Sequence, residues 1–270
     1  MGESVRAIVL DLDGTLLTPE LEISEEDLRA LDQARLAGML IIIATGRPLA
    51  SVTALFPNDS PVDYFVCSNG GAGFVVGQPT PIYTSYIQQK TTEQLIEVSR
   101  KFKVPIALYG STEWYVESDV SQVVLEISRS KSRPISVKDV TTVAERVVKA
   151  MYISENASLL RLIEAELKAG FASTVGWYYS YPEYLEVSPF EGGKLRAVDA
   201  ILRSHKIPWE AVIAVGDGDN DIPLLKTAGI GVAMGNSSEL VKSHANFITS
   251  TNAASGVRHA LAKFCGPYGQ

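Results

Sequence analysis

The sequence predicts an α/β protein in which a parallel sheet with helices on both faces is interrupted by an inserted α+β domain. Short apolar runs rich in Val and Ile alternate with helical patterns toward both ends of the chain, which is typical of strand–helix units that bury a parallel sheet. In the middle of the chain the pattern changes to aromatic and β-branched strands. The 270 residues also exceed the usual size of a single core, so two domains are expected.

The first part of the parallel sheet is expected to hold three strands, at residues 5–12, 39–45 and 64–68. Ser24 precedes three acidic residues, and this pattern supplies a helix N-cap with an acidic first turn. Gly38 suits the end of the same helix. We therefore expect residues 5–68 to contain a strand–helix–strand unit followed by a further strand.

The central segment is expected to contain strands of its own and two helices. Four strands are predicted at 106–109, 114–117, 151–154 and 184–188. Thr91 with Gln94 is interpreted as the cap of the first helix, and Asn156 as the cap of the second. Strands and helices that begin and end inside another alternating pattern indicate an inserted domain.

After residue 188 the alternation of apolar strands and helices returns. The expected elements are a helix at 194–204, a strand at 211–215, a helix from 221, a strand at 229–233 and two more helices. We therefore expect a discontinuous core at 1–84 and 189–270, with the inserted domain at 85–188.

Composition excludes several classes of function. The chain carries 24 Lys and Arg against 31 Asp and Glu, and a net charge of -7 disfavours binding to nucleic acid. The longest apolar run, at 38–45, is far shorter than the ~20 residues that span a bilayer, and the N-terminus lacks the pattern of a secretion signal. Cys67 and Cys265 lie far apart without a CxxC spacing, which gives a disulfide or zinc site no support. We expect a cytoplasmic protein with reduced thiols and no nucleic-acid or membrane partner.

Two aspartates follow the first predicted strand. Asp11 and Asp13 lie two residues apart, and strand spacing places both side chains on the same side. Two carboxylates so close raise each other's pKa unless a cation or hydrogen-bond donors lie between them. Mg2+ accepts one or two carboxylates together with waters and substrate phosphate, and open α/β sheets bind ligands beyond the carboxyl ends of their strands. Taken alone, the pair also fits a simple Asp-Gly turn with a solvated Asp11.

The other predicted strand ends carry complementary groups. Thr45 and Gly46 follow the second strand and offer a hydroxyl and an amide that an anion can approach closely. Lys194 opens a helix, where it can offset phosphate charge. The segment 215–221 delivers three carboxylates and an amide into a Gly-rich turn. Its spacing partly matches a calcium loop, but the Gly and terminal Glu of an EF-hand are missing.

In this order, these motifs resemble the four motifs of the haloacid dehalogenase-like hydrolases. They are Asp11-Leu12-Asp13-Gly14-Thr15-Leu16-Leu17, Thr45-Gly46-Arg47, Lys194, and Gly216-Asp217-Gly218-Asp219-Asn220-Asp221. The later segments 229–236 and 252–257 resemble the Cof-type branch of that superfamily. The resemblance implies a Rossmann-like parallel sheet core and an α/β cap inserted between the second and third motifs. One position departs from the branch, because Leu195 follows Lys194 where Gly is common.

Carried over by position, the resemblance implies a Mg2+-dependent phosphatase that hydrolyses a small phosphorylated metabolite of the sugar phosphate or phosphorylated cofactor type. Asp11 would be the nucleophile that forms an aspartyl-phosphate, and Asp13 the general acid and base. The implied metal ligands are Asp11, the backbone carbonyl of Asp13, Asp217 and Asp221. The implied phosphate-binding residues are Thr45, Gly46, Lys194 and Asn220.

Three other functions fit parts of the same pattern. A phosphoryl transferase or mutase would use the same aspartyl-phosphate and differ only in what attacks it. A phosphoaspartate signalling module needs a long-lived phosphoryl group, and Asp13 as a neighbouring acid and base disfavours this reading. An inactive ligand-binding scaffold is disfavoured by the complete set of motif residues.

Two further groups of residues are interpreted structurally. The aromatic residues Trp177, Tyr178, Tyr179 and Tyr181 suit either a substrate pocket or the core and sheet surface of the cap, and we favour the second reading. The three histidines, at 205, 244 and 259, are scattered over predicted helices without a second ligand at i+4, so we expect surface or packing roles.

Overall fold

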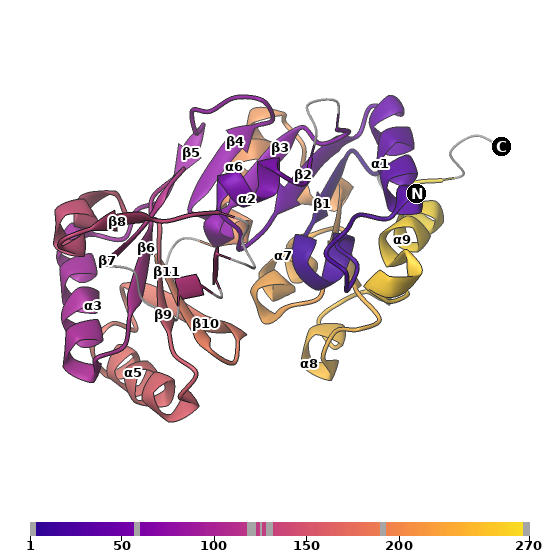
Figure 1. Cartoon of the computed structure of the whole chain (residues 1–270). Helices are drawn as coiled ribbons and strands as arrows, with labels where there is room; N and C mark the ends of the chain where they lie inside the picture. Colours follow the sequence, from indigo (N-terminus) through magenta and orange to yellow (C-terminus); the bar gives the residue numbers. More distant parts are fainter. Residues whose placement is uncertain are drawn as a thin grey trace.

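The computed structural model describes residues 4–56, 60–117, 123–124, 126–127, 132–189 and 193–266. Two sheets organise these residues, and Figure 1 shows them side by side. The sheet at the right of the view comes from both ends of the chain, and the sheet at the left comes from its middle. Two helices from opposite ends of the chain, α1 (Glu25–Leu36) and α9 (Gly256–Phe264), pack against each other beside the right-hand sheet. Among the described residues, no helix is long and apolar enough to cross a membrane.

The core sheet has eight strands in the order β14-β13-β12-β1-β2-β3-β4-β5. They are β1 (Ala7–Leu10), β2 (Leu40–Ala44), β3 (Tyr64–Cys67), β4 (Ala72–Val75), β5 (Tyr83–Thr84), β12 (Val212–Gly216), β13 (Ile230–Ala233) and β14 (Phe247–Ile248). The six strands from β14 to β3 are parallel, whereas β4 and β5 are antiparallel additions. Because β1 pairs with both β12 and β2, the segments that follow these three strands emerge next to one another.

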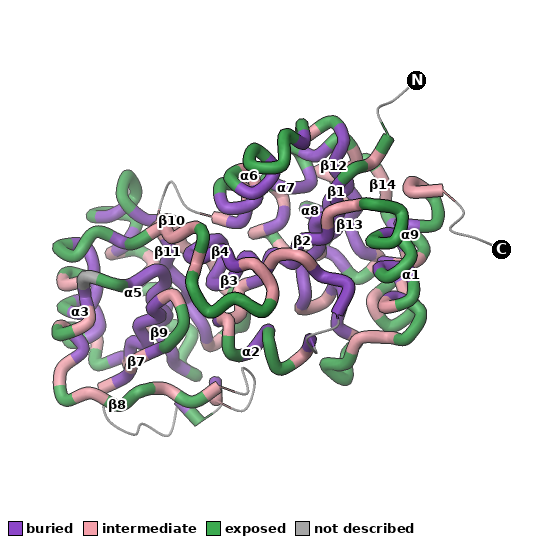
Figure 2. Tube along the Cα trace, turned by 90° about the horizontal axis from the view of Figure 1, so that it is seen from above, coloured by how far each residue is buried: buried purple, intermediate pink, exposed green. Residues whose placement is uncertain are grey.

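Helices cover both faces of the core sheet, because alternate residues of a strand point to opposite faces. Ile8 and Leu10 of β1 belong to a hydrophobic cluster with α1 and α9, while Ala7 and Val9 belong to one with α6 and α7. The core helices are α1 (Glu25–Leu36), α2 (Leu49–Thr53), α6 (Lys194–Ser204), α7 (Ile222–Thr227), α8 (Glu239–Lys242) and α9 (Gly256–Phe264). Figure 2 shows the buried residues gathered along the strands, with exposed residues on the outer sides of the helices.

The cap sheet has six strands in the order β10-β11-β9-β6-β7-β8. They are β6 (Ile106–Tyr109), β7 (Trp114–Glu117), β8 (Ile135–Val137), β9 (Lys149–Ile153), β10 (Val175–Tyr181) and β11 (Tyr184–Pro189). Two helices, α3 (Gln89–Phe102) and α5 (Ala157–Gly170), pack on one face through an apolar cluster that includes Leu185 and Val187 of β11. The opposite face carries Lys149 and Glu186, and both side chains contact loops of the core.

The predicted fold class is confirmed: a parallel α/β core with an inserted α+β cap. Helix α6 has the predicted bounds, and Ser24 and Asn156 cap α1 and α5 as expected. The predicted cap at Thr91 is wrong, because α3 begins earlier, after Gln88, and Thr91 is buried inside its first turn. The predicted domain boundaries, after residues 84 and 188, stay a prediction.

The sequence pattern does not predict the antiparallel edge of the core sheet. After β3 the chain turns at Asn69 and Gly70, which adopt positive φ angles of 55° and 90°. Glycine adopts such angles without strain, and Asn tolerates them better than most residues. The turn sends β4 back along β3, so Asn69 stays at the carboxyl end of the strand beside the candidate site.

Candidate active site

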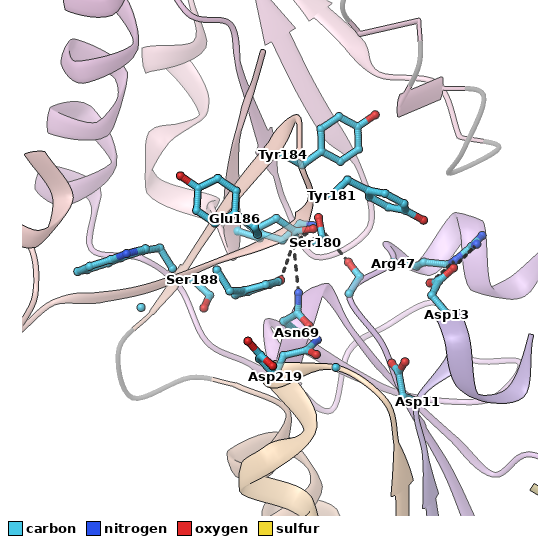
Figure 3. Close-up of a pocket in the computed structure, with 18 of the residues that line it drawn as sticks. Asp11, Asp13, Arg47, Asn69, Ser180, Tyr181, Tyr184, Glu186, Ser188 and Asp219 are labelled. Carbon is cyan, nitrogen blue, oxygen red and sulfur yellow. Dashed lines mark hydrogen bonds and ion pairs between the residues drawn. The ribbon is translucent and has the colours of Figure 1, made fainter. Parts of the chain in front are cut away.

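A cavity of about 820 Å³ lies between the carboxyl ends of the core strands and the cap sheet. Asp11 follows β1, Gly46 follows β2, Asn69 follows β3 and Asp217 follows β12, and all four line the cavity. The cap contributes side chains of β9, β10 and β11, among them Glu186. Figure 3 shows the core residues below the cap residues, with the cavity between them.

Three carboxylates converge at the floor of this cavity. Asp11, Asp217 and Asp221 each offer an oxygen within 4.8 Å of the others. Asp11 and Asp221 are almost completely buried. A group of carboxylate oxygens of this size suits a hard divalent cation such as Mg2+. Asp11 and Asp217 are 206 positions apart in the chain, and their carboxylates meet because β1 and β12 are neighbours in the sheet. The side chain of Asp13 is not part of the group.

The electrostatics of the group also fit a cation. Burial raises the pKa of Asp11 well above its usual range, and the charges of Asp221 and Asp217 add to this shift although Lys194 opposes it. Burial, followed by repulsion from Asp221, raises the pKa of Asp217 to about 6, although Thr15 donates a hydrogen bond to it. Carboxylates with pKa values raised in this way gain from a cation placed between them. The residues present therefore fit a bound Mg2+.

Lys194 joins two of the three carboxylates. Its Nζ lies 2.6 Å from Oδ1 of Asp11 and 2.7 Å from Oδ1 of Asp221. Burial alone would lower the pKa of Lys194, but the two carboxylates outweigh burial and raise it. The second oxygen of Asp221 accepts the backbone N–H groups of Asp217 and Gly218, at 3.1 and 3.0 Å. Asp221 thus fixes both the lysine and the turn that carries Asp217.

Asp13 and Arg47 form a separate ion pair at the edge of the cavity. Arg47 donates from Nε to Oδ2 of Asp13 at 2.8 Å and from Nη2 to Oδ1 at 2.6 Å, as the dashed lines beside Arg47 in Figure 3 show. Both residues line the cavity. A bidentate pair of this kind holds the carboxylate in one orientation. The sequence motif includes Arg47, but the spacing does not reveal its partner.

Of the remaining residues predicted to bind phosphate, Gly46 and Asn220 line the cavity, whereas Thr45 is buried. Thr45 is fully buried, and its hydroxyl accepts the backbone N–H of Arg47 at 3.1 Å, so its contact with phosphate stays a prediction. Gly46 lines the cavity, and its carbonyl accepts from Nζ of Lys149 at 3.0 Å. Asn220 also lines the cavity and donates to Oδ1 of Asn69 at 2.9 Å.

The later segments that resemble the Cof-type branch brace the loop after β1. Asn236 donates to the carbonyl of Gly14 at 2.8 Å, and Asn252 donates to the carbonyl of Leu17 at 2.7 Å. Asn236 also accepts the backbone N–H of Asn252 at 3.0 Å. These contacts satisfy backbone groups that the tight turn over Leu12–Leu16 leaves unpaired, and so help to fix the position of Asp13.

Gly14 lies in that turn with φ of +78°, and a Cβ at this position would overlap the carboxylate of Asp217. We expect Gly14→Ala to destabilise the fold by about 2 kcal/mol and to weaken Mg2+ binding at least about tenfold, because the methyl group must displace Asp217. Gly77→Ala is the matched control, since Gly77 has φ of +80° but open space around it. Urea unfolding and Mg2+ titration of both variants check this; equal Mg2+ affinity in the two variants would contradict it.

Sequence reasoning misses several cavity residues, among them Asn69, Lys149 and Glu186, and leaves the place of the aromatic run open. Trp177, Tyr178, Tyr179 and Tyr181 line the cavity, although Trp177 and Tyr179 also pack against the cap core. The predicted role in the cap core is therefore confirmed for Trp177 and Tyr179, and a contact of the run with substrate stays a prediction. A signal exists in β11, where Tyr184, Glu186 and Ser188 alternate with Leu185 and Val187, because such alternation marks a strand with one apolar and one polar face.

Leu195, the position that departs from the Cof-type branch, does not line the cavity. Its side chain packs against the apolar cluster between the core sheet and α6. The substitution therefore adds apolar contact on the core side of the helix, while the neighbouring Lys194 still reaches the carboxylates.

The chain resembles proteins of known sequence over almost its full length. A family model described as haloacid dehalogenase-like hydrolase matches residues 8–261. A 5-amino-6-(5-phospho-D-ribitylamino)uracil phosphatase of Bacillus subtilis is 26% identical, covering 95% of this chain and 94% of the relative. A pyridoxal phosphate phosphatase of Escherichia coli is 25% identical, covering 94% and 96%.

Solved structures agree with this relationship. A haloacid dehalogenase-like hydrolase from Bacteroides thetaiotaomicron superposes with a TM-score of 0.86 at 30% identity, covering 96% of this chain and 99% of that one. A sugar phosphatase of subclass IIB of the same superfamily superposes with a TM-score of 0.83 at 26% identity, again covering 96% and 99%. With the family model, these matches confirm the resemblance predicted from the four motifs, including its Cof-type branch. The chain belongs to the haloacid dehalogenase-like hydrolases.

Proposed function

We propose that this protein is a Mg2+-dependent phosphatase that hydrolyses a small phosphorylated metabolite through an aspartyl-phosphate on Asp11. The observation that carries the proposal is the convergence of Asp11, Asp217 and Asp221 with Lys194 at the floor of a cavity closed by the cap. The related phosphatases of Bacillus subtilis and Escherichia coli, which match this chain over nearly their whole length, support the same class of reaction.

Asp11 is suited to act as the nucleophile. Lys194 holds one of its oxygens, and among the described residues no hydrogen bond ends on the other. Lys194 also offsets the negative charge that otherwise repels a carboxylate from a phosphate dianion. Attack of a carboxylate oxygen of Asp11 on phosphorus breaks the bond to the leaving oxygen and forms the aspartyl-phosphate.

Asp13 is suited to move the protons in both steps. It would protonate the leaving oxygen in the first step and, in the second, take a proton from the water that attacks phosphorus and regenerates Asp11. Both of its oxygens accept from Arg47, so proton transfer requires that one of them be released. We propose that the substrate phosphate competes for the guanidinium, because Arg binds phosphate in the same bidentate manner.

Mg2+ would be held by Asp11, Asp217 and the backbone carbonyl of Asp13, with Asp221 in support, and when bound it would offset the charge of the transferring phosphoryl group. The two oxygens of Asp221 already accept from Lys194 and from the turn 217–218, so its support is expected to be indirect. Thr45, Gly46 and Asn220 lie around this position and are proposed to bind the phosphate oxygens.

Mg2+ should stabilise the folded protein, because a cation between raised-pKa carboxylates binds the native state only. At 100 times the dissociation constant the expected gain is about 2.7 kcal/mol in the free energy of unfolding. Differential scanning calorimetry with and without MgCl2 measures this gain as a rise in the melting temperature. Asp217→Asn should lose most of the rise, whereas Asp199→Asn on α6 should keep it. If MgCl2 does not change the melting temperature of the unmodified protein, the assigned site is contradicted.

The proposed reaction is tested by steady-state release of inorganic phosphate. Purified protein should release phosphate from p-nitrophenyl phosphate in the presence of Mg2+ and stop when the metal is chelated. Continuous release of free phosphate also separates hydrolysis from transfer to a second acceptor, which leaves no free phosphate. We further propose that residues 85–188 form the cap and that the cap determines which leaving group is accepted. Assays with a panel of phosphorylated metabolites would identify the leaving groups that the protein accepts.

A further inference from the structure

Three polar side chains of the cap, from neighbouring positions of three strands, face the cavity. Glu186 of β11 lies directly opposite Tyr178 of β10, and Lys149 of β9 lies two positions along the adjacent pairing. Glu186 and Lys149 are nearly fully buried, with 5% and 3% of their surfaces exposed. Glu186, Tyr178 and Lys149 all line the cavity above the catalytic carboxylates. A buried carboxylate on the wall of a cavity requires partners, because its desolvation is costly.

One oxygen of Glu186 has all of those partners. Its Oε2 accepts from the hydroxyl of Tyr178 at 2.6 Å, from Nζ of Lys149 at 2.9 Å and from Nδ2 of Asn69 at 3.2 Å. Figure 3 shows the dashed line that rises from Asn69 to the cap residues. Among the residues that the structure describes, no hydrogen bond or ion pair ends on the second oxygen, Oε1. Three donors therefore fix one oxygen of the carboxylate in place, and the described part of the chain supplies no donor to the other.

Two of the three donors, Lys149 and Asn69, have further partners that hold them in place. Lys149 also donates to the carbonyl of Gly46 at 3.0 Å, and its Nζ lies 4.2 Å from the centre of the Tyr109 ring. Asn69 accepts from Asn220 at 2.9 Å, which ties Glu186 to the turn that carries the metal-site carboxylates. A carboxylate held by anchored groups on both sides of the cavity is preorganised to meet a substrate.

We propose that Oε1 of Glu186 accepts a hydrogen bond from a hydroxyl or N–H group of the leaving group and thereby selects substrates that carry such a donor. This inference rests on the proposed phosphatase function. A leaving group without a donor leaves a desolvated carboxylate oxygen unpaired, and sites built to hydrogen-bond a substrate reject analogues that lack the matching group. The chemical class that fits is a polyol, sugar or amino-alcohol phosphate rather than a plain alkyl phosphate.

The first test varies the substrate and leaves the protein unchanged. Polyol phosphates of four, five and six carbons carry hydroxyls at every position, and the corresponding alkyl phosphates have the same length without donors. We expect kcat/KM to be at least about tenfold higher for the polyol member of the best pair, since a hydrogen bond to a charged group is worth roughly one to two powers of ten. Aminoalkyl phosphates of the same lengths show whether an N–H donor serves as well as a hydroxyl. Equal kcat/KM values across every pair would overturn the inference.

The second test changes Glu186. In Glu186→Gln the amide oxygen is expected to keep the three donors, so its NH2 group replaces the free acceptor. The preference for polyol over alkyl phosphates should fall about tenfold, because a charge-assisted acceptor is lost. Glu166→Gln removes the same charge from α5, where Glu166 pairs with Lys101 on the cap surface, and should leave the preference unchanged. An unchanged preference in Glu186→Gln, or an equal fall in both variants, would overturn the inference.

The outcomes separate this inference from the proposed function. If the unmodified protein does not hydrolyse p-nitrophenyl phosphate in the presence of Mg2+, the phosphatase function itself is contradicted. Hydrolysis of that ester with no polyol preference would contradict only the role of Glu186. If Glu186→Gln fails to fold, as its melting temperature would show, the substrate series on the unmodified protein still decides the question.

Discussion

Replacing Asp11 with Asn is expected to lower Mg2+-dependent hydrolysis of p-nitrophenyl phosphate by on the order of ten-thousandfold or more. The amide is a very weak nucleophile, and it also removes one of the charges that would hold the cation. The fold should survive, because an amide of the same shape still reaches Lys194, which keeps its ion pair with Asp221. Phosphate release measured over hours at equal protein concentrations gives the ratio of the two activities. The melting temperature of the variant shows whether it is folded.

The matched control for this variant is Asp32→Asn. Asp32 lies on the exposed side of α1 and does not line the cavity, and the change removes the same charge from the same residue type. Activity in the control should stay within about twofold of the unmodified protein, as is usual for a surface substitution. If Asp11→Asn keeps more than about one hundredth of the activity, Asp11 is not the nucleophile.

Replacing Asp13 with Asn is expected to lower kcat by about 10²- to 10⁴-fold, the usual contribution of general acid and base catalysis. The loss should be larger for an alkyl phosphate than for p-nitrophenyl phosphate, because the nitrophenolate leaves without a proton. The second step needs the base whatever the leaving group is, so phosphorylated protein should accumulate with the aryl ester. Rapid acid quench during turnover of p-nitrophenyl phosphate measures that fraction.

Two outcomes would contradict the role of Asp13. One is an equal loss for the alkyl and aryl esters, and the other is the absence of any phosphorylated protein in the variant. Asp219→Asn is a suitable comparison, because Asp219 is exposed and lines the same cavity but has no proposed part in the proton transfers. It shows how much of the effect comes from the change of charge alone.

The sequence allows the floor of the site to be predicted, because topology and local pattern agree there. Parallel strands end at one edge of a sheet, so aspartates that follow two strands are expected to meet there, and β1 and β12 are indeed adjacent. Burial first, and the crowding of the carboxylates second, raise the pKa values of Asp11 and Asp217. The roles of Asp11 and Asp13 in catalysis stay predictions, because they rest on the resemblance to the family and on geometry.

The roof of the site could not be predicted in the same way. The alternation in β11 shows that Glu186 and Leu185 face opposite sides of a sheet, but it does not say which side meets the core. That choice depends on α3 and α5, which cover the face of Leu185 and leave Glu186 to the cavity. The contact between Glu186 and Asn69 joins residues 117 positions apart in two different domains, and no local pattern in the sequence encodes it.

The pair of Asp13 and Arg47 shows a second limit. Strand spacing suggests that Asp11 and Asp13 point the same way, but β1 ends at Leu10 and Asp13 lies in a tight turn with a different backbone direction. The carboxylate of Asp13 pairs with Arg47 and is not part of the group formed by Asp11, Asp217 and Asp221. Both side chains still line the same cavity, as the spacing of two residues predicts, but that spacing does not reveal the pairing of Asp13 with Arg47.

The central claim is that a phosphoryl group passes through Asp11, and peptide mapping of the quenched protein tests it most directly. The Asp13→Asn variant is mixed with p-nitrophenyl phosphate and Mg2+, quenched in acid during turnover and digested, and the peptides are analysed by mass spectrometry. We expect the added mass of one phosphoryl group on the peptide that contains residues 7–17, with fragmentation placing it on Asp11. A phosphoryl group on any other residue, or phosphate release without a phosphorylated peptide, would contradict the account.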